Sequence, residues 1–218
     1  MRTKTLLLTA VLGVAGVAAT TAQAQSVYSL NAVGYVNLSL GTGFTIIANP
    51  LNNTTNDIQT LLTGMPNNTV VYGFNPTTQA YLPSTFRTAT GKWTVDLVMN
   101  PGSGAFISLP SPATVTFVGN VPQGALVNTI PPGFSIQAYQ IPVSTAITNT
   151  ALINFPTPNN NDIVYAFSNA SGSYVPHTYR SSTGLWTGAM YSPAVGEGFF
   201  YLSTAAAAIT WTVNFSVN

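Results

Sequence analysis

The sequence predicts an all-β fold made of two tandem homologous β-sandwich or small-barrel units, with one or two short helices each. Three observations lead to this prediction: apolar and polar residues alternate along several segments, turn residues separate these segments, and a long stretch of the chain occurs twice. From Ile209 to Val217 every odd position is apolar, whereas every even position is Thr, Asn or Ser. Such alternation is typical of a strand with one buried face.

The duplicated stretch determines the predicted domain organisation. Aligned without a gap, Val71–Trp93 and Val164–Trp186 are identical at 10 of 23 positions, which is far more than chance gives two unrelated segments. A proline-containing stretch near residues 120–133 separates the two copies. We therefore predict a signal peptide over residues 1–24, a first β unit over 25–121 and a second over 122–218.

Other elements follow from local patterns. Alternation from Tyr28 to Leu40 predicts an amino-terminal strand, and Gly34 within it suggests a bulge. A further alternating set runs from Trp93 to Met99 and predicts another strand. Residues 57–62 and 145–155 have the caps and spacing of short helices.

The amino terminus has the features of a secretory signal peptide. Arg2 and Lys4 precede an apolar run over residues 6–19, and Ala22-Gln23-Ala24 forms a small-x-small cleavage site before Gln25. The run is shorter than the roughly 20 residues of a membrane-spanning helix. We therefore expect a secreted product, extracellular or at the cell surface, with no transmembrane segment after cleavage. The chain has no cysteine that could carry a lipid or form a disulfide.

Charge excludes several classes of partner. Only 4% of the 218 residues are charged, and removal of the signal peptide leaves Arg87, Lys92 and Arg180 against four carboxylates, a net charge of 3 − 4 = −1. So few cations cannot neutralise a run of phosphates, which excludes nucleic acid as a partner.

The inventory of reactive side chains predicts no enzyme and no cofactor. The four carboxylates are scattered singly, no nucleophile-elbow pattern occurs, and His177 is the only histidine. Because the first copy has Ser84 at the matching position, we interpret His177 as an exposed strand or loop residue. Zinc lacks ligands, while a calcium site at Asp162 with residues 159–161 stays open as an alternative to a plain turn.

The order of motifs resembles a module repeated in many uncharacterised secreted bacterial proteins. The matching residues in the first copy are Gly43-Phe44, Asn49-Pro50-Leu51, Val71-Tyr72-x-Phe74, Trp93 and Pro101-Gly102-x-Gly104-x-Phe106. The second copy departs from this pattern, with Tyr139-Gln140 in place of Asn49-Pro50. The resemblance covers nearly all of the chain beyond the signal peptide and implies a secreted β-module without an established activity.

Six residues at repeated positions are candidate ligand-binding residues: Tyr81, Arg87, Trp93, Tyr174, Arg180 and Trp186. The tyrosines and tryptophans could form a flat platform for sugar rings, and the arginines could anchor an anionic or glycan ligand. The alternative, which we favour, is structural: the tryptophans pack in the core, and each arginine stacks on a tryptophan or binds backbone carbonyls.

Two functions remain. The first is a structural or surface-assembly protein of the cell exterior that self-associates through its terminal strands, with Tyr28, Leu30, Val36, Trp211, Val213 and Phe215 as candidate assembly residues. Pairing of these strands within one chain is the alternative to assembly. The second is a module that binds extracellular polysaccharide through its repeated tyrosine and tryptophan positions.

Overall fold

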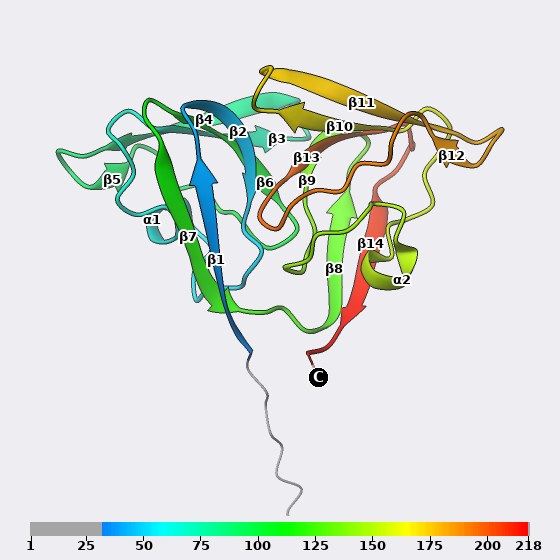
Figure 1. Cartoon of the computed structure of the whole chain (residues 1–218), viewed down its shortest axis with the longest axis horizontal. Coiled ribbons are helices and arrows are strands. Elements are labelled where there is room, and N and C mark those ends of the chain that lie inside the picture. Colours follow the sequence, from blue (N-terminus) through cyan, green and yellow to red (C-terminus); the bar gives the residue numbers. More distant parts are fainter. Residues whose placement is uncertain (1–31, 218) are drawn as a thin grey trace, which may run out of the picture. The chain divides into compact units, whose positions relative to one another are not determined.

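The two halves of the chain repeat one order of strands and a single short helix (Figure 1). The computed structural model describes residues 32–217. The first half contains β1 (Val33–Leu40), β2 (Gly43–Ala48), α1 (Ile58–Leu61), β3 (Val70–Asn75), β4 (Ala80–Arg87), β5 (Lys92–Trp93), β6 (Gly104–Leu109) and β7 (Ala113–Asn120). The second contains β8 (Gly124–Ile130), β9 (Gly133–Gln137), α2 (Thr150–Ile153), β10 (Ile163–Ser168), β11 (Ser173–Arg180), β12 (Leu185–Trp186), β13 (Phe199–Ser203) and β14 (Ile209–Phe215). The all-β prediction is confirmed.

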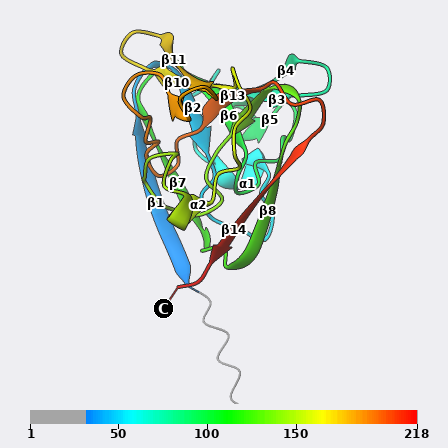
Figure 2. The ribbon, with the colours of Figure 1, turned by 90° about the vertical axis from the view of Figure 1, so that its right-hand side faces the viewer.

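Strand pairing is the same in both halves. The first half has a five-stranded sheet in the order β2-β6-β3-β4-β5, and the second half has β9-β13-β10-β11-β12. Each half adds a two-stranded antiparallel sheet, β1-β7 or β8-β14, and Figure 2 shows these two pairs of strands from the side. Trp93 pairs with Phe86 as Trp186 pairs with Tyr179, so the duplication seen in the sequence is a duplication of structure.

Each two-stranded sheet covers an apolar core of its own half. Val115 and Phe117 of β7 are fully buried in the first core, and Trp211 and Val213 of β14 are fully buried in the second. Thr210 and the other even positions of β14 lie on its outer face. The alternation predicted for this strand is therefore correct.

A third apolar cluster joins the halves. Ile46, Phe106, Ile136 and Phe200 are buried together, two from each half. The backbone reinforces this junction, because the Ala48 N–H donates to the Gly196 carbonyl at 2.8 Å and the Ala138 N–H to the Gly102 carbonyl at 3.0 Å.

A glycine allows the backbones to approach at this junction. A Cβ atom on Gly104 would lie 2.9 Å from both the Ile136 side chain and the Ile47 carbonyl oxygen. Since real Cβ atoms do not approach other atoms so closely, only glycine fits there. The first and second halves therefore pack directly against each other at Gly104.

Three local predictions need correction. Gly34 forms no bulge: it pairs directly with Gly119 in an unbroken register, and glycine is needed because a Cβ would collide with Leu51. The strand predicted from Trp93 to Met99 ends at Trp93, beyond which the chain is irregular and Val95 is exposed. The helices are shorter than predicted, four residues each.

Two further points concern the ends of the chain. Tyr28 and Leu30 of the predicted amino-terminal strand lie outside the described residues. Between residues 32 and 217, no helix has the length and apolar character needed to cross a membrane.

Candidate functional site

Ten aromatic side chains form a continuous face on the two five-stranded sheets, here called the aromatic face. They come as five pairs of counterparts, one from each half: Phe44 and Phe134, Tyr72 and Tyr165, Phe74 and Phe167, Tyr81 and Tyr174, Phe106 and Phe200. Residues two apart in a strand point to the same side of a sheet, which brings Tyr72 and Phe74 together on this face. The strands that carry it lie on the side of the molecule away from the start of β1 and the end of β14 (Figures 1 and 2).

The rings pack edge to face across the junction between the halves. Phe106 contacts Phe167 with ring centroids 5.1 Å apart and planes at 89°, and Phe74 contacts Phe200 at 5.2 Å and 81°. Perpendicular packing of this kind is favourable for aromatic rings and holds each ring in one orientation. The aromatic face is therefore a preorganised surface.

A groove of about 310 Å³ opens in this face, here called the aromatic groove, and it is lined by Phe44, Tyr72, Tyr81, Phe106, Phe167, Gly172 and Tyr174. Three of its rings are substantially open to solvent, with exposed fractions of 51% for Phe44, 46% for Tyr81 and 41% for Tyr174. The residues lining it carry no charge. Its volume lies at the lower end of the range of small-ligand pockets.

The groove also carries phenol groups, those of Tyr72, Tyr81 and Tyr174. Partial burial, followed by the neighbouring Tyr81 phenol, raises the pKa of Tyr174 above its ordinary value. Tyr174 therefore keeps its proton at neutral pH. The groove combines apolar ring faces with neutral hydroxyls that can donate and accept hydrogen bonds.

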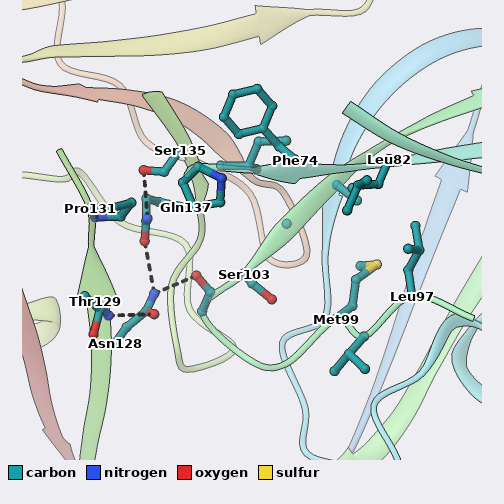
Figure 3. A pocket seen from close by; sticks show the side chains of 17 residues that line it. Phe74, Leu82, Leu97, Met99, Ser103, Asn128, Thr129, Pro131, Ser135 and Gln137 are labelled. Carbon is teal, nitrogen blue, oxygen red and sulfur yellow. Dashed lines mark hydrogen bonds between the residues drawn. The ribbon is translucent and has the colours of Figure 1, made fainter. Parts of the chain in front are cut away.

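A second cavity of about 340 Å³, here called the mixed cleft, lies at the junction of the halves (Figure 3). Leu82, Leu97 and Met99 lie on one side of it and Asn128, Ser135 and Gln137 on the other. Its polar groups already bond one another. Asn128 Nδ2 donates to the Gly102 carbonyl and to Gln137 Oε1 at 2.8 and 3.0 Å, and Gln137 Nε2 donates to Ser135 Oγ at 2.9 Å.

The counterpart of the mixed cleft is smaller, about 140 Å³. Leu38 takes the place of Asn128 there and packs at Gly196, the counterpart of Gly102. Because the polar groups of the mixed cleft are satisfied within the protein, the aromatic groove is the better candidate for ligand binding.

The candidate ligand residues predicted from the sequence divide between two places. Tyr81 and Tyr174 line the aromatic groove. Trp93 is buried in the first core, where its ring packs on Phe86 and its Nε1 donates to the Leu62 carbonyl at 3.3 Å. Trp186 is half-buried beside Tyr179. The tyrosines and tryptophans thus do not form one platform.

Four residues of the groove were missed by sequence reasoning, namely Phe44, Tyr72, Phe106 and Phe167. All four belong to motifs that the duplication repeats, and each is aromatic in both copies. That shared aromatic character was the available signal.

The arginines have partners that the sequence did not suggest. Arg87 Nη1 donates to Asn68 Oδ1 and Arg180 Nη1 to Asn161 Oδ1, both at 2.6 Å. Each asparagine has a left-handed backbone, with φ of 65° and 66°. Instead of stacking on tryptophan or binding a backbone carbonyl, each arginine holds the turn that precedes β3 or β10.

His177 is buried, so the prediction of an exposed residue is wrong. Its Nδ1 donates to the Thr187 carbonyl at 3.3 Å, and its ring stacks on Tyr191. The counterpart, Ser84, is also buried and donates from Oγ to the Val95 carbonyl at 2.5 Å. The polar residue at this position therefore connects β4 to the segment after β5 in the first half, and β11 to the segment after β12 in the second half.

Asp162, considered for calcium, is fully buried and bonded within the protein. Its Oδ2 accepts from the Asn159 N–H at 2.8 Å and the Tyr201 hydroxyl at 2.6 Å, and its Oδ1 accepts from the Thr204 N–H and Oγ1, each at 2.7 Å. Burial, followed by the bond to Asp162, raises the pKa of Tyr201. Among the described residues, no cluster of three or more His, Cys, Asp and Glu side chains could hold a metal ion.

The candidate assembly residues that the structure describes face inward. Trp211 and Val213 are fully buried, and Val36 and Phe215 pack against the two cores. Their strands pair within the chain, β1 with β7 and β14 with β8.

Comparisons with protein-family models, with curated proteins and with solved structures found no match to this chain.

Proposed function

We propose that this protein is a secreted, non-catalytic module that binds a neutral extracellular polysaccharide in the aromatic groove. The observation that carries the proposal is the groove itself: three of its rings are open to solvent, two of these rings are the phenols of Tyr81 and Tyr174, and no lining residue is charged. The C–H face of a pyranose ring is apolar and packs on an aromatic ring, while its hydroxyls need hydrogen-bond partners nearby. Rigid aromatic side chains with hydroxyl groups offer both at little entropic cost.

The charge of the protein supports a neutral ligand. Within residues 32–217 the cationic side chains of Arg87 and Arg180 are engaged with asparagines in turns, outside the groove. An acidic glycan would bring its charge into a groove that holds no cation, whereas an uncharged glycan avoids the cost of burying a charge and needs only hydrogen-bond partners for its hydroxyls.

The test is binding of the purified protein, without its signal peptide, to soluble neutral polysaccharides by affinity electrophoresis and calorimetry, and to insoluble glycans by pulldown. Tyr174→Ala should weaken binding about two- to tenfold, since an aromatic contact contributes roughly 0.5–1.5 kcal/mol. Tyr35→Ala is the matched control, because Tyr35 is an exposed tyrosine on β1, outside the groove. Absence of binding to every neutral glycan, or an equal loss in both variants, would reject the proposal.

A second candidate function, self-association into an extracellular structural layer, has support from the outer face of the β1-β7 sheet. Val33, Tyr35 and Val118 are exposed there at 72%, 66% and 44%, and Tyr35 and Val118 are direct cross-strand neighbours. An apolar patch on a short, uncharged sheet is an association surface for a second copy. Light scattering of native protein and of Tyr35→Ser tests it: a monomer at high concentration in both cases contradicts assembly.

A further inference from the structure

The hairpins β3–β4 and β10–β11 end in equivalent four-residue turns that differ in one decisive side chain. Gln79 in the first turn and Gly172 in the second occupy the same position, with similar left-handed φ values of 54° and 59°. Gly172 lines the aromatic groove, and a Cβ placed on it would have no atom within 4 Å. There is thus open space beside Gly172 where the first half has a side chain, that of Gln79.

The space equivalent to that at Gly172 lies beside Phe134, at the other end of the aromatic face, and the Gln79 side chain fills it. The Phe134 N–H donates to Gln79 Oε1 at 3.1 Å, and Gln79 Nε2 donates to the Phe134 carbonyl at 3.0 Å. Phe134 lies on β9, the edge strand of its sheet. The carboxamide therefore satisfies both main-chain groups that Phe134 turns away from the sheet.

Phe44, the counterpart of Phe134, lies on edge strand β2 with the same main-chain orientation. The Ala48 N–H donates to Gly196 and the Ile46 carbonyl accepts from Gly198, so even-numbered residues of β2 direct these groups away from β6. Within residues 32–217, no side chain reaches Phe44 as Gln79 reaches Phe134. Phe44 is correspondingly more exposed, at 51% against 39%.

We propose that the aromatic face contains two equivalent glycan sites of which Gln79 plugs one, and that the Phe44 main chain is the polar anchor of the open one. Resting on the proposed function, this assigns the ligand a neutral pyranose with two adjacent free hydroxyls. One hydroxyl accepts from the Phe44 N–H and its neighbour donates to the Phe44 carbonyl, while the ring packs in the aromatic groove. The Gln79 carboxamide supplies the same donor and acceptor pair at Phe134, and each chain binds one glycan.

The plug is tested without any ligand, by hydrogen exchange of the Phe44 and Phe134 amides measured by NMR. In the native protein the Phe134 amide should exchange at least tenfold more slowly than the Phe44 amide. Gln79→Gly should abolish that protection, and Gly172→Gln should slow exchange at Phe44. Thr78→Gly and Ala170→Gln are matched controls in the same two turns and should change neither amide. Equal protection of the two amides in the native protein overturns the proposal.

The anchor is tested by calorimetry with neutral hexasaccharides of glucose, mannose and xylose. We expect one site per native chain, none in Gly172→Gln and two in Gln79→Gly, with folding of each variant checked by thermal unfolding. If the exchange results hold and no hexasaccharide binds the native chain, the proposed function and this ligand class fail while the plug stands. If the native chain binds but both variants keep one site, the anchor is wrong. Binding of a glutamine-containing peptide in place of the sugars would also overturn the assigned ligand.

Discussion

The two halves share their strand order and registers, yet at one buried position they have different side chains with different hydrogen-bond partners. Thr69 begins the β3 hairpin in the first half and donates its hydroxyl to the Pro66 carbonyl at 2.8 Å. Its counterpart, Asp162, accepts four hydrogen bonds and connects the β10 hairpin to Tyr201 and Thr204. In both halves the backbone carbonyl of this residue accepts from the facing strand, Phe86 or Tyr179. The backbone ladder is thus the constant feature, and the side-chain network around it is free to change.

The apolar cores differ in a similar way. Val115 and Phe117 fill the first core from β7, where Trp211 and Val213 fill the second from β14. The larger side chain moves one layer along the strand and the smaller one takes its former place. A core tolerates such an exchange when its total volume and its alternation are kept.

Replacing the paired tryptophans should give the largest difference between the halves. Trp93→Ala removes a buried ring and its bond to Leu62, at a cost of about 3–5 kcal/mol in the free energy of unfolding. Trp186→Ala should cost about half as much, because Trp186 is only partly buried. Denaturant unfolding of both variants measures this. An equal loss of stability would mean that the two positions are equally packed in solution.

Removing the buried carboxylate should have an intermediate effect. Asp162→Ala leaves the buried Tyr201 hydroxyl without an acceptor and should destabilise the protein by about 1–3 kcal/mol. The double variant Asp162→Ala/Tyr201→Phe should lose less stability than the sum of the losses in the two single variants, since both changes remove the same interaction. Thr69→Ala in the first half should destabilise the protein less than Asp162→Ala does. Additive losses in the double-mutant cycle would contradict the coupling.

The helix caps should give the smallest difference. Asp57 accepts the Thr60 N–H at 2.7 Å at the start of α1, whereas Asn149, before α2, makes no side-chain capping bond. Asp57→Ala should cost about 0.5–2 kcal/mol, and Asn149→Ala should cost less. Thermal unfolding at pH 7 compares them.

The same cap predicts a dependence on pH. A hydrogen bond from Thr55, the largest influence, holds the pKa of Asp57 below its usual 3.8. A carboxyl group with a lowered folded-state pKa contributes stability above its unfolded pKa, and the contribution is lost as the pH falls through the folded value. The difference between native protein and Asp57→Ala should therefore shrink below about pH 4. A difference that stays constant down to pH 2 would contradict this role of the cap.

Much of the fold could be predicted because it depends on local alternation and on the duplication. The β14 pattern is visible in residues 209–217 alone, and the paired hairpins become visible when residues 71–93 and 164–186 are aligned. The irregular segment after Trp93 was misread, because its apolar residues alternate without a partner strand to pair them. His177 was misread for a related reason: burial of a polar ring depends on Thr187 and Tyr191, which are close only after folding.

The sequence predicted only some of the residues of the candidate site. The sequence by itself determined that tyrosine, phenylalanine and tryptophan positions recur, that the chain is nearly uncharged and that it folds as paired β units. Only the tertiary structure decided which aromatics share a surface, because it places Trp93 inside a core and gathers Phe44, Tyr81 and Tyr174 around a groove. It also decided that the Gln79 side chain binds the main chain of edge strand β9 at Phe134, whereas no described side chain does so at Phe44 on edge strand β2. The difference between Gln79 and Gly172 has no meaning until the turn that carries each lies beside the edge strand of the opposite half, since hydrogen bonds act only over a few ångströms.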